Sequence, residues 1–440
     1  MVTQSRTFDT IIVGGGLAGL TSAALLSSAG QNVAVIERRA GFGGRGASHR
    51  DENGFIFNQG PHALYNGGPA RKVFDRLGIQ MTGSYPARNL KLLLNGRLAP
   101  LPGNLPDILF SQILSLKAKV ELIGFLSGIN SINCESIANI DFESWAAKRF
   151  RDVDTRKLVR ALVRVSTYAE GLDYVSAGAA MTQLRVAFKG VTYLDGGWQS
   201  LVDQLVEICQ RNDVALLNSV HAQSLLHNSN DSRIDLHLST DELISGTNLV
   251  VALPPASTRE LLGVSNYVRE VTSNLVPIRA ACLDLALKNL PHDDLTFVLN
   301  LDKPYYYSVH SAYAKLAESG VLLHVMKYLS PSDSADESVQ MELEQYLDEL
   351  QPGWRNLVIH RRFLPSMVVS NKVHNYRVHN PADVEVPDLA NVFLVGDWIS
   401  DEGMLLDAAI ASAAKASRTI LQQSPARQRE IVLTSEPAAF

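Results

Sequence analysis

Cysteine is scarce in this sequence, and the three that occur, Cys134, Cys209 and Cys282, lie far apart. Three separated thiols form neither a disulfide framework nor a CxxC metal or redox pair. The histidines show no HExxH or other close metal spacing, and no GxSxG nucleophile turn occurs. We therefore expect no metal site, no acyl-transfer chemistry and a reducing, cytoplasmic location.

The sequence also lacks an excess of basic charge. Forty Lys and Arg residues oppose forty-five Asp and Glu residues, which gives a formal net charge of −5. No run of basic residues interrupts this balance, and binding to a phosphate backbone requires a concentrated positive face. We expect no nucleic-acid partner.

Long hydrophobic runs are absent as well. No apolar stretch reaches the roughly 18 residues that a membrane-spanning helix needs, and the polar first ten residues do not resemble a signal peptide. The nearest candidate, residues 101–129, is interrupted by Pro106 and four charged residues. We interpret it as an internal amphipathic helix pair, with a helix lying on a membrane surface as the alternative. A peripheral membrane contact therefore stays open.

The most informative segment that is present is glycine-rich and lies near the N-terminus. Residues 9–13 have the pattern of a buried strand, and a GxGxxG motif at Gly14, Gly16 and Gly19 leads into an alanine-rich helix predicted over 20–29. A second strand, over 33–36, ends in Glu37. Strand, glycine turn, helix and acidic residue stand in the order that a dinucleotide-binding βαβ unit requires.

Each part of this motif has a physical role. Gly14 permits the tight turn, Gly16 lets the backbone of Leu17 and Ala18 approach a pyrophosphate, and Gly19 lets the helix pack closely on the strand. Glu37 would accept hydrogen bonds from the ribose hydroxyls of an adenosine, which favours FAD or NAD over a 2′-phosphate. A P-loop is excluded because Leu20 occupies the position of the required lysine. The alternative is a purely structural βαβ unit.

A second glycine-rich segment follows. Arg38 precedes the Gly43-Gly44-Arg45 tripeptide, in which Arg45 can offer a planar fork to phosphate oxygens. Residues 55–59 then form a short strand that ends in the turn Gly60-Pro61-His62.

In the GxGxxG motif, the acidic residue followed by Gly-Gly-Arg, and the Gly-Pro-His turn, the sequence resembles the flavin amine oxidase and phytoene desaturase superfamily, which also contains protoporphyrinogen oxidases. The resemblance implies bound FAD. It also implies an α/β fold in which a Rossmann-like FAD-binding domain is interleaved with a mixed α+β substrate domain. We predict the FAD-binding domain at 1–85, 190–275 and 386–422, the substrate domain at 86–189 and 276–385, and a C-terminal tail at 423–440.

The C-terminal region carries the remaining parts of the expected cofactor site. A strand over 391–395 ends in Gly396 and Asp397, and a helix is predicted over 408–421. The resemblance implies that Asp397 accepts from the ribityl hydroxyls of the flavin. It also implies that the backbone of Gly403, Met404 and Leu405, at the start of a helix, faces the N1–O2 edge of the flavin. Ser412 and Ala413 depart from the glycine that is often found here in the family.

The middle of the chain is less specific. A helix over 200–209 and strands at 214–217, 234–238 and 249–253 resemble the second cofactor-domain segment of the superfamily, where a backbone amide near Val220 would contact the adenine. Strands at 280–287 and 321–328 are typical of a sheet that covers a pocket. The tyrosines at 305–307 either pack in the core or line an apolar cavity. We interpret Lys327 as a solvated charge at a strand end.

The C-terminal segment, Gly396-Asp397-Trp398 followed by Glu-Gly-Met-Leu, resembles bacterial phytoene-dehydrogenase-like oxidoreductases most closely. We therefore expect FAD-dependent oxidation, by C–C desaturation, of an apolar, isoprenoid-like substrate, with oxygen or a quinone as electron acceptor. His62 is our candidate for handling the released proton; alternatively, it only hydrogen-bonds the turn or the flavin. The competing functions are an amine or porphyrinogen oxidase and, in another class, a non-catalytic flavin- or isoprenoid-binding protein. The lysine that many amine oxidases carry is missing from residues 277–283.

Overall fold

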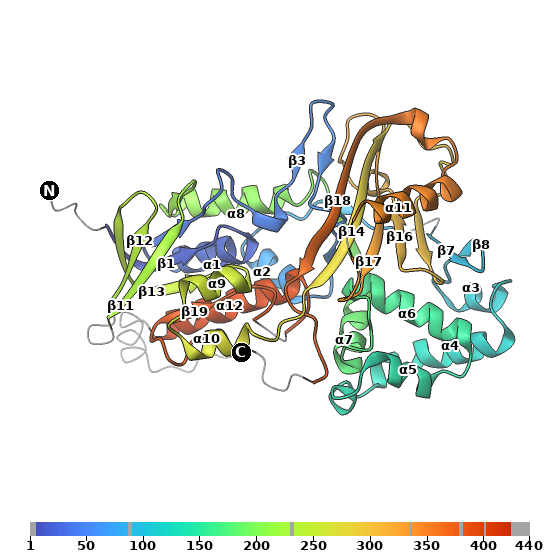
Figure 1. The fold of residues 1–440 in the computed structure, drawn as a ribbon, viewed down its shortest axis with the longest axis horizontal. Coiled ribbons are helices and arrows are strands. Elements are labelled where there is room, and N and C mark those ends of the chain that lie inside the picture. Colours follow the sequence, from blue (N-terminus) through green and yellow to red (C-terminus); the bar gives the residue numbers. More distant parts are fainter. Residues whose placement is uncertain are drawn as a thin grey trace.

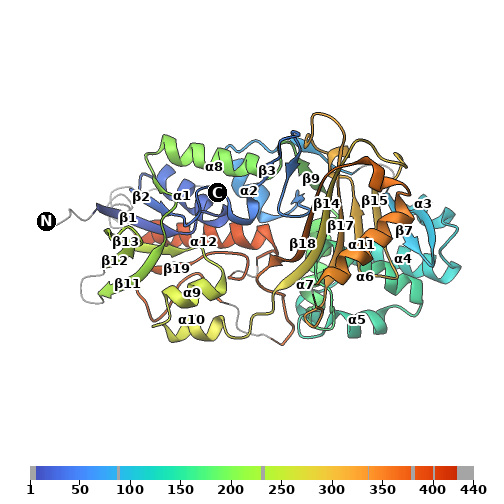
Figure 2. The same cartoon turned by 45° about the horizontal axis from the view of Figure 1, so that its top comes forward.

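The computed structural model describes residues 6–86, 90–228, 233–334, 336–377, 382–399 and 402–423. Except for Gln423, the predicted C-terminal tail lies outside these residues. Figures 1 and 2 show a sheet with its helices at the N-terminal end of the molecule, and a second sheet with a helical block at the other end. The chain passes between the two ends several times.

The first sheet contains seven strands within the described residues, in the order β10-β2-β1-β13-β12-β11, with β19 paired to β13. The pairs that β1 makes with β2 and β13 are parallel, and so are β10 with β2 and β13 with β19. The last four residues of β1 are buried, as expected for a parallel strand covered on both faces. The strands are β1 Arg6–Val13, β2 Val33–Ile36, β10 Ala215–Leu217, β11 Ala222–Asn228, β12 Arg233–Leu238, β13 Leu243–Val251 and β19 Val392–Leu394.

Three long helices pack together beside this sheet: α1 (Leu17–Ser28), α8 (Gln199–Arg211) and α12 (Leu406–Gln423). Helix α1 begins three residues before the predicted start because Gly16 already adopts the extended backbone of an N-cap. The shorter helices of this region are α2 Pro69–Arg76, α9 Pro255–Leu261 and α10 Asn266–Val271.

The second sheet has the order β18-β14-β17-β16-β15-β7-β8, counted over the described part of the chain. Alternate residues of β14 point to opposite faces. Ala281, Leu283 and Leu285 pack with the apolar side of α11, whereas Ala280 and Cys282 face the helical block. The elements are β7 Leu90–Leu94, β8 Arg97–Pro100, β14 Ile278–Leu287, β15 Phe297–Asn300, β16 Tyr305–Ser308, β17 Val321–Leu329, β18 Val358–Ser370 and α11 Glu337–Leu350.

The helical block consists of α3 Leu105–Phe110, α4 Leu116–Gly128, α5 Phe142–Arg149, α6 Val153–Thr167 and α7 Ala177–Ala187. Residues 101–129 do form a helix pair, α3 and α4. The pair is only partly internal, because Phe110 and Leu116 are largely exposed. No helix within the described ranges has both the length and the apolar character needed to cross a membrane.

Short strands connect the two ends of the molecule. Strand β9 (Val191–Leu194) pairs with β5 (Leu64–Tyr65) and β6 (Gly83–Ser84), and β3 (His49–Arg50) pairs with β4 (Ile56–Phe57). Short 3-10 helices occupy Gly44–Gly46, Ile129–Ser131, Glu135–Ile137, His310–Ala312 and Trp354–Leu357.

Candidate active site

A cavity of about 1250 Å³ extends from the carboxyl ends of β1 and β2 to strand β18 of the second sheet. It exceeds the ~300–1,000 Å³ typical of pockets for drug-sized ligands. Gly19, Gly60, Gly403 and Met404 do not line it. The predicted site residues that line it are Gly14, Gly16, Leu17, Ala18, Glu37, Arg38, Gly43, Gly44, Arg45, Pro61, His62, Val220, Gly396, Asp397 and Leu405.

The GxGxxG turn has no space for side chains. A Cβ on Gly14, whose φ is +109°, would lie 2.5 Å from the carbonyl oxygen of Ala252, and one on Gly19 would lie 1.9 Å from the carbonyl oxygen of Gly14. Helix α1 therefore packs directly against the turn, which explains why Gly19 matters although it does not line the cavity. The first intrahelical bond is donated by Leu20 to Gly16 (2.9 Å). The N–H groups of Leu17 and Ala18 thus have no intrahelical acceptor and form an anion-binding helix N-terminus.

Glu37, which follows the last residue of β2, stabilises this turn by hydrogen bonds. Its Oε2 accepts from the Gly15 N–H at 2.8 Å and its Oε1 accepts from the Arg39 N–H at 2.9 Å. Each carboxylate oxygen keeps a second lone pair for a ribose hydroxyl. The Val220 N–H donates to the carbonyl oxygen of Glu37 at 3.0 Å, and the contact of a backbone amide near Val220 with the adenine stays a prediction. Residues 220–223 line the cavity.

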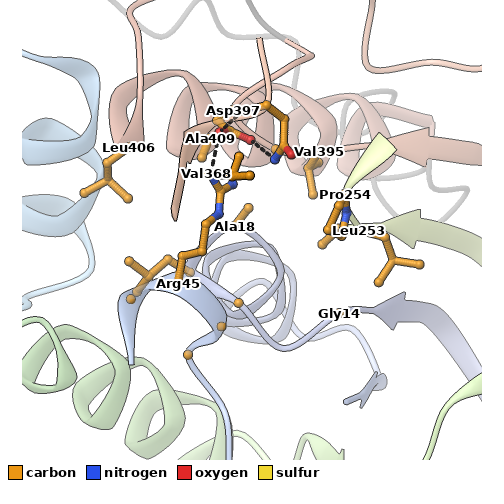
Figure 3. A pocket seen from close by; sticks show the side chains of 18 of the residues that line it. Gly14, Ala18, Arg45, Leu253, Pro254, Val368, Val395, Asp397, Leu406 and Ala409 are labelled. Carbon is orange, nitrogen blue, oxygen red and sulfur yellow. Dashed lines mark hydrogen bonds and ion pairs between the residues drawn. The ribbon is translucent and has the colours of Figure 1, made fainter. Parts of the chain in front are cut away.

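Arg45 and Asp397 form an ion pair that joins the two ends of the chain. Figure 3 shows Arg45 pointing toward Asp397, with its Nη1 2.8 Å from Oδ2. Asn371 donates both its backbone and side-chain N–H groups to the same carboxylate. Burial alone would raise the pKa of Asp397, but Arg45 and Asn371 outweigh it and lower that pKa. The sequence placed Arg45 at phosphate and Asp397 at ribityl hydroxyls, whereas the structure pairs them with each other.

Ser412, the departure from the family glycine, links α12 to the end of β19. Its Oγ accepts from the Gly396 N–H at 2.9 Å and lies 3.2 Å from the Gly396 carbonyl oxygen. The serine therefore fixes the turn that carries Asp397 to helix α12.

Asp407, in the first turn of α12, is a cavity residue that the sequence analysis missed. Its Oδ1 accepts from the Ala70 N–H at 2.9 Å, which caps α2, because the N-cap Gly68 has no side chain for this purpose. Its Oδ2 is buried and has no hydrogen-bond partner among the described residues. Burial raises the pKa of Asp407 to about 6. The missing cap at Gly68 was the only signal in the sequence.

His62 lines the cavity from the turn that follows strand β4. Its Nδ1 is 2.9 Å from the Gly60 carbonyl oxygen, and its ring meets Trp198 edge-to-face with centroids 4.5 Å apart. Burial lowers the pKa of His62 to about 4. The imidazole is therefore neutral at pH 7, and donation from Nδ1 to Gly60 leaves the lone pair on Nε2.

The cavity wall around His62 is mostly apolar. The hydroxyl groups of Tyr65 and Tyr168 are bound to the carbonyl oxygens of Ser166 (2.8 Å) and Pro61 (3.4 Å). Met367 of β18 packs so close to Gly60 that a Cβ there would lie 2.4 Å from its Sδ. Sequence reasoning missed these lining residues because no local motif marks them: Gln59, Ala63, Leu64, Tyr65, Tyr168, Trp198, Met367 and Leu406.

A buried polar row lies behind this wall, across β18, β14 and β17. Asp284 pairs with Arg362 on one neighbouring strand and with Nδ1 of His324 (2.6 Å) on the other. Burial would raise the pKa of Asp284, but His324 and Arg362 lower it. Arg362 also donates to the carbonyl oxygen of Asn58, two residues before Gly60. The second sheet is thereby tied to the turn that carries His62. Cys282, Asp284 and His324 lie close enough together to hold one metal ion. The guanidinium of Arg362, however, already neutralises the charge of the Asp284 carboxylate.

Two interpretations from the middle of the chain are now settled. The tyrosines at 305–307 pack within the second sheet and do not line the cavity. Lys327 is neither solvated nor at a strand end: it lies within β17, is 17% exposed and binds Glu342 of α11 at 2.6 Å.

Similar proteins are known in sequence and in structure. Residues 17–421 match the family described as flavin containing amine oxidoreductase. The chain is 23% identical over 382 residues to phytoene desaturase of Neurospora crassa, which covers 76% of this chain and 64% of that protein. It is 32% identical over 120 residues to chloroplastic protoporphyrinogen oxidase 1 of Arabidopsis thaliana, covering 26% and 22% of the two chains. The chain thus spans less than two thirds of the length of these relatives.

Solved structures share the fold at low identity. An oxidoreductase from Methanosarcina mazei superposes with a TM-score of 0.76 at 18% identity, covering 93% of this chain and 100% of that one. A triple mutant of putrescine oxidase superposes with a TM-score of 0.75 at 14% identity, covering 96% and 100%. These likenesses confirm the predicted α/β fold class.

The residues present fit the expected cofactor. The glycine turn that excludes side chains, the free N–H groups at the start of α1 and the carboxylate of Glu37 all line one cavity large enough for a dinucleotide. These observations and the match over residues 17–421 agree with the FAD cofactor predicted from the sequence: the chain belongs to the flavin containing amine oxidoreductase family.

Proposed function

We propose that this protein is an FAD-dependent oxidoreductase that desaturates an apolar, isoprenoid-like substrate. One observation carries the proposal: the cavity wall around His62 is mostly apolar, and the nearby charge of Arg45 is paired with Asp397. Its described lining there is formed by Ala63, Leu64, Tyr65, Tyr168, Met367, Leu405 and Leu406. The phytoene desaturase alignment, which covers 76% of the chain, supports the same choice.

The alternative of an amine substrate has weaker support. A cationic amine is bound best where a carboxylate without a cationic partner offsets its charge. The aromatic rings of Tyr65, Tyr168 and Trp198 that line the cavity suit a cationic and an apolar substrate alike. Asp397 is paired with Arg45, and Asp407 accepts from the Ala70 N–H through Oδ1 while its Oδ2 is buried. The described residues that line the cavity also include no lysine, the residue that many amine oxidases carry. A neutral, apolar substrate therefore matches this part of the cavity better.

The chain's own residues would hold the cofactor in an extended form. The N–H groups at the start of α1 would bind the pyrophosphate, Glu37 the adenosine ribose, and the Arg45–Asp397 pair the region between phosphate and ring. Leu405, with a φ of +58°, would turn the backbone at the start of α12 toward the ring. When bound, FAD supplies a hydride acceptor at flavin N5.

His62 is our proposed proton acceptor. Formation of a C=C bond removes one hydride and one proton from neighbouring carbons, and the proton needs a base within reach of the substrate. The neutral imidazole of His62 offers Nε2 at any pH above about 5, because burial holds its pKa at about 4. Trp198 and Gly60 orient the ring.

The test is an anaerobic panel with the FAD-loaded protein. Phytoene-like polyenes, primary amines and porphyrinogens are added separately, and bleaching of the flavin absorbance is followed. We expect bleaching by polyenes alone, with colour returning when oxygen or a quinone is admitted. Bleaching by an amine or a porphyrinogen alone would overturn the substrate assignment, and a bound flavin that no compound reduces would favour a non-catalytic binding protein.

The role of His62 is tested separately. We expect His62→Ala to retain FAD and to slow flavin reduction by at least about 100-fold, the usual contribution of a general base. Unchanged reduction at unchanged FAD content would show that His62 only hydrogen-bonds the turn.

A further inference from the structure

The helical block, together with Leu98 of strand β8, carries an apolar surface that the cavity does not use. We call it the α3–α4 face and define it by the exposed side chains of Leu98, Leu105, Leu109, Phe110, Leu116 and Val120. Both helices lie at the end of the molecule opposite the first sheet (Figures 1 and 2). We propose that this face docks the protein on a bilayer surface that contains anionic lipid.

The exposure of this face is concentrated. Among the described residues, fifteen large apolar side chains are exposed, and six of them fall between residues 98 and 120. Phe110 is 83% exposed and Leu116 is 79% exposed. Single exposed apolar residues are ordinary on a soluble protein, but a cluster indicates a binding surface.

Packing of the helix pair does not explain these residues. Helices α3 and α4 are anchored from the inner side by Ile108, Ala118, Leu122 and Phe125, which are all buried in the core of the helical block. Leu116 and Val120 are four residues apart, so they share the outer side of α4. The fold is therefore satisfied without the outer side chains, which remain available for a partner.

Charge favours an anionic lipid surface as that partner. Arg97, Lys117 and Lys119 oppose the single acidic residue Asp107 between residues 97 and 120, although the whole chain carries a net charge of −5. Lys117 stands exposed beside Leu116 in the first turn of α4. Leucine and phenylalanine tips flanked by lysine are the pattern of helices that lie in a membrane interface. Such docking is independent of the proposed substrate.

The experiment is vesicle co-sedimentation of the FAD-loaded full chain. Vesicles of phosphatidylcholine with a fraction of phosphatidylglycerol are compared with phosphatidylcholine alone. We expect binding to the anionic vesicles that weakens as salt is raised. The triple variant Phe110→Ser/Leu116→Ser/Val120→Ser should bind at least about tenfold more weakly.

Matched controls separate docking from general surface effects. Val264→Ser/Met341→Ser removes two apolar side chains that are 75% and 60% exposed outside this face, and it should bind as the wild type does. Lys117→Glu should weaken binding, whereas Lys288→Glu, at another exposed lysine, should affect it much less. FAD absorbance and thermal unfolding show that each variant is folded.

Two results would overturn the proposal. One is a wild-type protein that stays in the supernatant with anionic vesicles, or a triple variant that binds as well as the wild type. The other is concentration-dependent self-association of the wild type, seen by analytical ultracentrifugation without vesicle binding and lost in the triple variant. That second result would assign the α3–α4 face to a contact between copies of the chain.

Discussion

Replacing Asp407 with asparagine tests whether burial dominates the energetics of this carboxylate. Asp407 lies in the first turn of α12, receives one hydrogen bond from Ala70 and keeps its second oxygen buried without a partner. Asparagine has nearly the same shape and can still accept from Ala70, but it carries no charge. The variant therefore removes the charge while it keeps the cap on α2.

The magnitude follows from the pKa of Asp407, which burial raises from 3.8 to about 6. Below pH 3.8 the carboxyl is protonated in the folded and unfolded states, so it has no effect on the stability of one state against the other. As the pH rises from 3.8 to about 6, the unfolded state ionises while the folded state stays protonated, so the folded state loses about 3 kcal/mol relative to the unfolded state, at 1.36 kcal/mol for each pH unit between the two values. The dipole of α2 favours the charged form by only about 0.3–1 kcal/mol. The cost of burying the charge should therefore exceed the stabilisation by the helix dipole.

The assay is urea unfolding of wild type and Asp407→Asn between pH 4 and pH 8, with and without FAD. We expect the variant to be more stable by up to about 3 kcal/mol at pH 8 and the difference to vanish near pH 4. Asp152→Asn is the matched control, because hydrogen bonds from Thr155, Asp154 and Ser115 outweigh burial and lower the pKa of Asp152. It should be destabilised at pH 8 and less so in acid. A variant of Asp407 that is less stable at pH 8 than at pH 4, relative to wild type, would refute the reasoning.

Three further substitutions test other parts of the structure. Gly19→Ala should abolish FAD retention, measured by flavin absorbance, since its Cβ would lie 1.9 Å from a carbonyl oxygen, whereas Gly41→Ala, with nothing within 4 Å, should retain FAD. Arg362→Met should lower the free energy of unfolding by about 3–5 kcal/mol because it removes the guanidinium partner of the buried Asp284, which then keeps only its bonds to His324 and Cys282, and Arg362→Met/Asp284→Leu should recover most of that loss. Lys327→Met should change stability by less than about 1 kcal/mol and leave the rate of flavin reduction unchanged; a large loss of rate would show that this lysine serves the cavity rather than Glu342.

Local sequence determined the cofactor end of the molecule. The turn at Gly14 and Gly19, helix α1 and the carboxylate of Glu37 lie within 24 consecutive residues, and short-range geometry relates them. Glycine is required there because a Cβ would collide with neighbouring backbone, so the residue types themselves report the structure. Strand β2 also occupies the predicted residues, Val33–Ile36, because its run of buried apolar residues is a local pattern.

Tertiary structure alone decided which distant groups meet. Arg45 and Asp397 are 352 residues apart, and their ion pair is a contact that the sequence did not indicate. Asp407 caps a helix 337 residues away, and the amide of Val220 is taken by Glu37. Whether Leu116 is buried or exposed likewise depends on which side of α4 meets the core. Such contacts depend on how the elements pack, and residue type and spacing carry no record of packing between distant segments.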